Sequence, residues 1–338
     1  MDNHLPQPPK NSAGYAPPRA PGSARRTSSI DVSWPEGRAG NMRLVARARD
    51  LVTPLAGAPI VCAEDGFVAE VRMDRTIMAI RAEPERVDLS RLVGERGGGH
   101  LRVLLNEVLP QERKGATPLY LILDDISGAS LVAGWAWSQW EPSWGEQMRQ
   151  AMKDRGGVGR TMEGVCIGFA PGSSALAPDR TVSSGAPAPD LRRPDDPEGW
   201  HAFTQQDGAV GMRRARRIDV RLEDQIVIDA AFQDSSTTPG GGRMVLHEYR
   251  LSATADPKSL RITSLAAEPR VLPFPECPSA AHNLTRLVGT RIDDLRQTVL
   301  DELRGTAGCT HLNDAVRSLA EAPALVGLLQ KHGGLAEA

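Results

Sequence analysis

Four residues in the last third of the chain carry side chains that bind transition metals, namely His247, Cys277, Cys309 and His311. Two thiolates and two imidazoles are ligands that Zn²⁺ or ferrous iron accepts, and four of them can close a tetrahedral site. Three such ligands and one open position would instead make a catalytic site. Only Cys309 and His311 are close in sequence, so the fold must bring the others to them. The pattern predicts a zinc or iron site, with His311 as fourth ligand or as an acid–base group.

Two other interpretations stay open for these residues. A thiol and an imidazole can form a metal-free catalytic pair, and a buried Cys or inward-facing His is often a packed core residue. Cys309 precedes a predicted helix, whose N-terminal dipole should stabilise a thiolate and lower the pKa of the thiol. Cys166 and His282 are reserve ligands, for which core packing and a solvated loop, respectively, are the simpler interpretations.

The chain contains an internal repeat. Residues 25–32 (RRTSSIDV) match residues 213–220 (RRARRIDV), and residues 89–96 (LSRLVGER) match residues 284–291 (LTRLVGTR). Three weaker matches fall in the same order, and collinear matches of this kind indicate a duplication. The predicted organisation is a disordered tail 1–24, a first copy 25–146, a connecting segment and linker 147–211, a second copy 212–321 and a C-terminal tail 322–338.

The two copies differ in their candidate ligands, because every soft ligand of the second copy is missing from the first. The segment that carries Cys277 has no counterpart, and the other ligands align as His247 with Asp65, Cys309 with Ala116, and His311 with Pro118. This joint replacement predicts one working site, in the second copy, and one degenerate copy kept as a structural partner.

Asp234 is a further candidate, as a metal ligand or as the general base of a reaction. It ends a predicted strand and aligns with Asp50 of the first copy. Because the degenerate copy keeps this carboxylate, a structural role such as capping a turn also stays open.

Hydrophobic periodicity predicts the elements that must position these residues. Residues 216–224 and 225–234 are two short strands, and 244–256 alternates so that His247 shares its inward face with Val245 and Tyr249. A fourth strand, 259–271, is followed by an amphipathic helix over 284–303 and a second helix with Thr310 as its N-cap. The expected fold is α+β, with two tandem homologous domains that each have a small antiparallel sheet covered by helices.

Composition narrows the function classes. The 338 residues include 40 basic and 42 acidic side chains, giving a net charge of −2 and no basic stripe for nucleic acid or an anionic membrane. Four cysteines without a CxxC pair predict reduced thiols, and no signal peptide or membrane span is expected, so a cytoplasmic protein is predicted. The arginines of 213–217 are interpreted as a solvated strand entry. The Trp residues at 135–144 predict a helix face that closes the interface between the two copies, or that binds a protein partner or a second copy of the chain.

The second copy resembles a bacterial family of unknown function, DUF2889. The resemblance rests on RRIDV with the following Asp234, the LHEY strand, Cys277 after a Pro-rich segment, LVG and above all GCTHL. It covers about 110 residues of the second copy and implies nothing about a reaction. The order of strands, Cys, helix and Cys-x-His is also similar to SufE/NifU-like iron–sulfur scaffold domains, although His247 stands where those proteins have an early Cys.

The function expected from these residues is that of a metal-dependent enzyme, a lyase or hydrolase acting on a small organic substrate. A zinc or iron ion would polarise a carbonyl or lower the pKa of a bound water. The alternative is a protein that holds a metal or iron–sulfur cluster without turnover.

Overall fold

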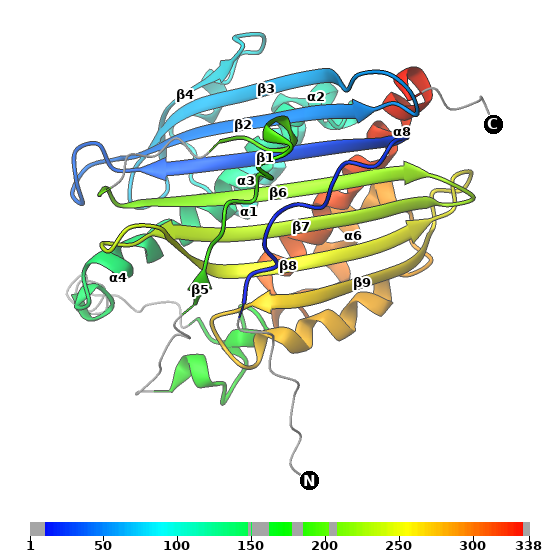
Figure 1. The fold of residues 1–338 in the computed structure, drawn as a ribbon. Coiled ribbons are helices and arrows are strands. Elements are labelled where there is room, and N and C mark those ends of the chain that lie inside the picture. Colours follow the sequence, from blue (N-terminus) through cyan, green and yellow to red (C-terminus); the bar gives the residue numbers. More distant parts are fainter. Residues whose placement is uncertain (1–10, 148–149, 151–161, 178–184, 203–207, 334–338) are drawn as a thin grey trace.

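The computed structural model describes residues 11–147, 150, 162–177, 185–202 and 208–333. Its strands form one antiparallel sheet in the order β4-β3-β2-β1-β6-β7-β8-β5, with β9 also beside β8 (Figure 1). The strands are β1 (Ser23–Ser33), β2 (Met42–Thr53), β3 (Ile60–Val71), β4 (Ile77–Glu83), β5 (Ala186–Pro187), β6 (Gly211–Leu222), β7 (Ile226–Thr237), β8 (Arg243–Ala255) and β9 (Ile262–Val271).

Alternation along the strands separates a helix-facing side from a polar side. In β2, Leu44, Ala46 and Ala48 are buried in the apolar core, whereas Arg43, Arg47 and Arg49 alternate with them. A period of two places successive side chains on opposite faces of a sheet, so one strand serves both layers. The strands predicted over 216–271 are confirmed as β6 to β9.

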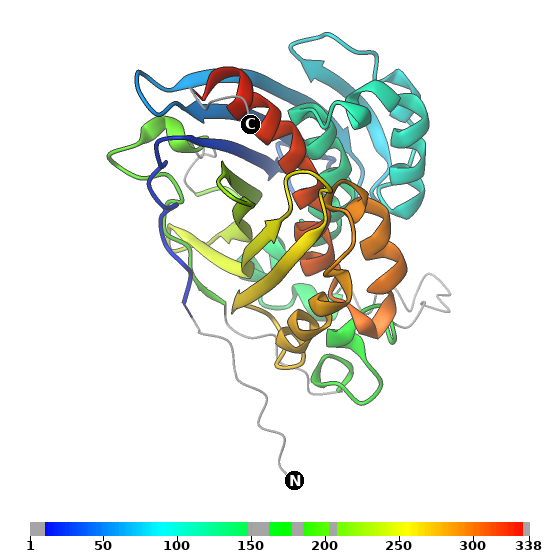
Figure 2. The ribbon, with the colours of Figure 1, turned by 90° about the vertical axis from the view of Figure 1, so that its right-hand side faces the viewer.

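All the longer helices lie on one face of the sheet (Figure 2). The helix α8 crosses beneath the central strands β1 and β6, and α3 packs under β1 to β3. The helices are α1 (Gly99–Val108), α2 (Pro110–Lys114), α3 (Pro118–Val132), α4 (Trp135–Trp140), α6 (Leu295–Glu302), α7 (Thr310–Arg317) and α8 (Ala322–His332).

The opposite face of the sheet is crossed by the N-terminal segment and part of the connecting segment (Figure 1). The Ala13 amide donates to Glu248 of β8, and the Ala16 amide donates to the Leu191 carbonyl. The predicted disordered tail 1–24 is therefore wrong from residue 11 onward. Its polar and proline-rich composition does not prevent ordering here, because its backbone groups find partners on a polar sheet face.

The expectation of an α+β fold is confirmed, but the two predicted copies share one sheet. Strand β1 pairs with β6 along its whole length, from Ser23 opposite Arg221 to Ser33 opposite Gly211. Each set of four strands would otherwise expose a long edge of unpaired backbone groups. The pairing removes both edges, which is why the copies do not form separate sheets.

Several predicted elements differ in their boundaries. The helix expected over 284–303 is broken into a 3₁₀ helix, Cys277–Leu287, and α6, because Gly289 adopts a φ of +88° between them. Residues 322–332 of the predicted C-terminal tail form α8, which buries Leu325 and Leu329. The helix predicted over the Trp residues at 135–144 is shorter in the structure, where α4 ends at Trp140.

One helical stretch, Pro118–Trp140, is long and apolar enough to cross a membrane by length and composition. The expectation of no membrane span did not take account of this stretch. The fold gives a different reason for its hydropathy, since 83% of the most apolar window is buried inside the protein, against the sheet.

Candidate functional site

The candidate site lies beside a buried network of charges between the sheet and the helices. Arg213, Arg214, Arg216 and Arg217 are each 3% exposed or less, so the predicted solvated strand entry is wrong. Buried arginines need paired carboxylates. The connected network on the helix side comprises Arg26, Arg102, Arg214, Arg216, Arg296 and Arg317 with Asp50, Asp124, Asp125, Asp234, Asp314 and Glu321.

Asp234 joins this network to the site. The Arg214 guanidinium donates to both of its carboxylate oxygens, at 2.9 and 3.0 Å, and to Asp314 at 3.3 Å. Burial opposes ionisation of Asp234, but Arg214 and His247 outweigh it and hold the pKa of this carboxyl well below its usual range. Asp234 is therefore a fixed anion in the protein interior.

A β-bulge beside His247 places Val245 on the other face of the sheet, while His247 keeps the helix-facing side that it shares with Tyr249. His247 pairs with Asp234 across β7 and β8, and the register then shifts so that Ser235 faces Val245. The extra residue, Leu246, changes the alternation, and Val245 packs in a separate cluster with Ala186 and Val271. The inward orientation predicted for His247 holds, but Val245 does not share its face.

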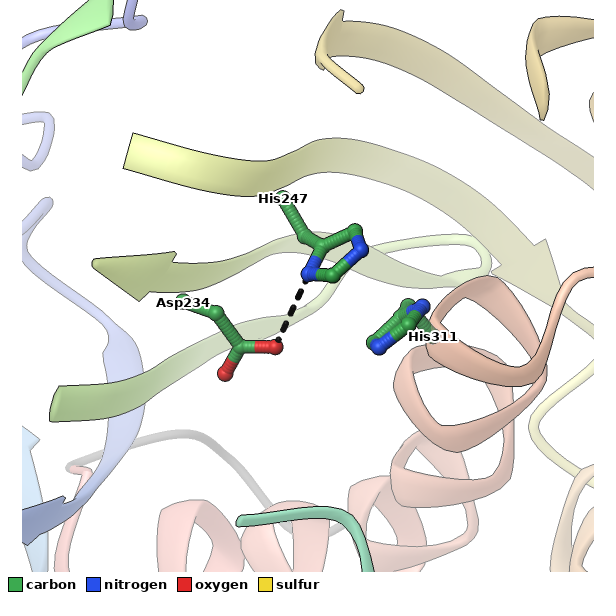
Figure 3. A group of neighbouring side chains, drawn as sticks. All are labelled: Asp234, His247 and His311. Carbon is green, nitrogen blue, oxygen red and sulfur yellow. Dashed lines mark ion pairs between the residues drawn. The ribbon is translucent and has the colours of Figure 1, made fainter. Parts of the chain in front are cut away.

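His311 approaches from α7 and stacks on His247. The two ring centroids are 3.4 Å apart with 18° between the planes, and His247 Nδ1 lies 3.3 Å from Asp234 Oδ2 (Figure 3). Ligand atoms of these three residues lie within 4.8 Å of one another. Burial lowers the pKa of both imidazoles, and for His311 the neighbouring His247 lowers it further. Both rings are therefore neutral at neutral pH, the form in which imidazole binds metals.

A cavity of about 300 Å³ opens onto the two imidazoles. Its walls come from three parts of the chain: the end of α3 with Trp135, residues 162–169, and the second half. His247, Cys277, Cys309 and His311 all line it, as does Cys166. The fold thus brings the four main predicted ligands and Cys166 to one pocket, although in sequence they span residues 166–311, whereas Asp234 and His282 are not part of its lining.

The cysteines do not join the cluster of ligand atoms. Within the described residues, the group that lies within 4.8 Å contains Asp234 and the two imidazoles, but neither Cys277 nor Cys309. Cys309 is the N-cap of α7, a position expected for Thr310, and accepts a hydrogen bond from the Tyr249 hydroxyl at 3.5 Å. The reserve ligand His282 is exposed and lies outside the pocket lining.

The thiols are not activated. Burial raises the pKa of Cys309, and burial together with the neighbouring Cys309 raises that of Cys277. The predicted lowering of the Cys309 pKa is wrong, because loss of solvation outweighs the helix N-terminus at a residue that is 2% exposed.

Iodoacetamide labelling at pH 8 tests the state of the thiols, because the thiolate reacts and a raised pKa leaves less of it. We expect Cys277 and Cys309 to react at least about 100-fold more slowly in the folded protein than in urea. Half-buried Cys62 should react first, and mass spectrometry of tryptic peptides identifies each adduct. Faster reaction of Cys309 than of Cys62 would contradict this assignment.

Sequence reasoning missed Arg214 as a partner of the site. The available signal was the alignment of Arg26 and Asp50 with Arg214 and Asp234, since both pairs form two-pronged ion pairs in the structure. The Trp residues contact one another rather than forming one helix face: Trp137 lies 5.5 Å from Trp34 and 6.3 Å from Trp144 between ring centroids.

Comparisons with known proteins give a family match for part of the chain and no activity. No curated protein and no solved structure matches the chain. The matched region begins in β6 and ends in α8, so it holds Asp234, His247, Cys277, Cys309 and His311. Residues 212–325 match the family described as a protein of unknown function, DUF2889, which supports the assignment of this part of the chain to that family.

Proposed function

We propose that this protein is a metal-dependent enzyme, a lyase or hydrolase that acts on a small organic substrate in the pocket beside His247. The observation that carries the proposal is the convergence of two neutral imidazoles and a carboxylate within 4.8 Å at a cavity. Imidazoles are ligands suited to zinc or ferrous iron, and a carboxylate beside a metal-binding His is the partner that usually orients it. The ion would act as a Lewis acid or lower the pKa of a bound water.

Asp234 suits the role of an orienting partner better than that of a primary ligand. Both of its oxygens already accept hydrogen bonds from Arg214, and Oδ2 also faces His247 Nδ1. A carboxylate that faces one ring nitrogen of a metal-binding His fixes its tautomer and leaves the other nitrogen to bind the ion. His247 and His311 are therefore the proposed primary ligands, and Cys309 or Cys277, which line the same cavity outside the cluster of ligand atoms, would have to move toward them to complete the set.

The stacked rings set a condition on metal binding. Imidazole lone pairs lie in the ring plane, so two nearly parallel planes 3.4 Å apart do not direct both lone pairs at one ion. One ring must turn. His311 is the ring with freedom to do so, because it is partly exposed and begins a helix, whereas His247 is held in a sheet and paired with Asp234.

Metal analysis tests the proposal. Purified protein that has been stripped with a chelator and titrated with Zn²⁺ or Co²⁺ is expected to bind one ion. His247→Ala and His311→Ala should each lower the affinity for that ion at least about 100-fold. His282→Ala is the matched control, since this exposed His lies outside the pocket lining. Because burial keeps the imidazoles neutral, affinity should fall less below pH 6.5 than for exposed His ligands. Binding that is unchanged in both variants would reject the site.

A second candidate function is metal-free proton transfer by the Asp234–His247 pair. The two-pronged contact from Arg214 favours it, because this contact occupies Asp234 and leaves the buried His247 as the base. The two candidates separate in one measurement. Chelator-treated protein without metal keeps its activity only under the second.

We also propose that the two halves descend from a duplication and that the first has lost the site. The support is a set of ion pairs at aligned positions: Arg25 with Asp219, and Arg213 with Asp31, cross the central strand pair in opposite directions. At the position of His247, Asp65 instead accepts from Arg86, which also bridges to Glu112. A guanidinium thus occupies the first half's counterpart of the proposed metal site.

A further inference from the structure

The cavity beside the imidazoles has an apolar side away from them. Leu131, Val132 and Trp135 from the first half line it together with Phe169 and Phe274, whose ring centroids are 5.6 Å apart in an edge-to-face arrangement. At about 300 Å³ the cavity is at the small end of ligand-binding pockets. The part of a ligand that lies inside this volume is of the size of one substituted ring.

The mouth of the cavity is also apolar. Leu131, Met162 and Val165 line the cavity and are 45–50% exposed to solvent. Exposed apolar side chains gathered at one opening are unfavourable unless an apolar partner covers them. Because they surround a cavity that ends at two imidazoles, the partner they suit is a ligand that enters the pocket.

The described lining of the cavity presents no charged side chain to the apolar part, or body, of a ligand. Among the described residues that line it, none is Asp, Glu, Lys or Arg. The polar groups of the described lining are the two imidazoles, the Thr310 hydroxyl, the Trp135 indole and the three thiols. A phosphate or sulfonate on the ligand body would lose its hydration without gaining a cation.

We propose, on the basis of the function proposed above, that the substrate has a small uncharged apolar body, the size of one substituted ring, which lies against Val132, Trp135 and Phe274. A single polar head group of the same molecule reaches His247 and His311. The first half of the chain therefore contributes substrate contacts to the site of the second half, although it carries none of the proposed ligands.

Three probes test the body of the ligand by calorimetry or by protein NMR. 4-Ethylphenol carries the apolar ring and a polar head, glycerol lacks the ring, and 4-hydroxybenzenesulfonate places a charge on it. We expect 4-ethylphenol to bind in a saturable way and at least about tenfold more tightly than the other two. Equal affinity for the three probes, or no binding of any, would overturn the inference.

Substitutions at exposed positions place the binding in this cavity. Leu131→Trp narrows the mouth at a half-exposed residue, so folding should be unaffected, and it is expected to weaken 4-ethylphenol binding by about tenfold. Leu300→Trp, on an exposed part of α6 outside the lining, is the control and should bind as the natural protein does. Unchanged affinity in Leu131→Trp would overturn the proposed location.

The probes also separate this inference from the metal proposal. Binding of 4-ethylphenol to protein that fails to bind zinc would leave the ligand class standing and remove the metal. Zinc binding without a preference among the three probes would leave the metal proposal standing and reject only the proposed ligand class.

Discussion

Replacement of Arg214 by methionine is expected to lower the free energy of unfolding by about 3–5 kcal/mol, because it leaves buried carboxylates without their cation. Arg214 is 1% exposed and contacts Asp234, Asp314 and, at 3.7 Å, Asp125. Methionine keeps most of the volume and removes the guanidinium. Urea unfolding followed by circular dichroism measures the change.

The pH dependence of this loss has a defined sign. In the natural protein Asp234 and Asp314 have lowered pKa values, so they stabilise the fold above about pH 4 and lose that contribution as the pH falls further. Without Arg214 the buried carboxylates take up protons more readily. The difference between Arg214→Met and the natural protein should therefore shrink on acidification.

The control for Arg214→Met is Arg221→Met. Arg221 pairs with Glu223 at the surface, and both side chains are more than 40% exposed. Exposed pairs contribute about 0–1 kcal/mol. A loss below about 1 kcal/mol in Arg214→Met, similar to that of the control, would contradict the interpretation of the buried network. If Arg214→Met does not fold, Arg214→Lys keeps the charge without the two-pronged contact and should show an intermediate loss.

Gly128→Ala is expected to destabilise the protein by about 3 kcal/mol, even though alanine favours helices over glycine. Gly128 lies in α3, and a Cβ there would be 1.7 Å from Arg214 Nη1 and 2.8 Å from Asp314 Oδ2. The guanidinium cannot move aside cheaply, because three carboxylates hold it. The glycine lets a helix of the first half pass over the ion pair that positions Asp234.

Gly327→Ala makes the matched comparison. Gly327 is an exposed residue within α8, and a Cβ there meets nothing within 4 Å. The same substitution should stabilise the protein there by about 0.5–1 kcal/mol. Thermal and urea unfolding of both variants should give changes of opposite sign. A neutral or stabilising Gly128→Ala would show that Arg214 has room that the structure does not give it.

The local pattern of the chain determined the strands of the second half and the region that holds the candidate site. Alternation over 216–271 depends only on which residues are apolar, and it predicted β6 to β9 and the inward direction of His247. The absence of His247, Cys309 and His311 from the first copy pointed to one half of the chain. These features follow from neighbouring residues, so sequence alone can report them.

Tertiary structure decided how those residues combine. Whether an arginine is solvated or buried depends on carboxylates that are far away in sequence. The arginines of 213–217 therefore could not be recognised as buried from composition. Arg214 contacts Asp125 and Asp314 only after α3 and α7 pack on the sheet. The sulfur of Cys309 lies at a helix N-terminus as predicted, but burial raises its pKa, and burial is a property of the whole fold. Pairing of β1 with β6 likewise turned two expected sheets into one and carried the end of α3 to the wall of the pocket.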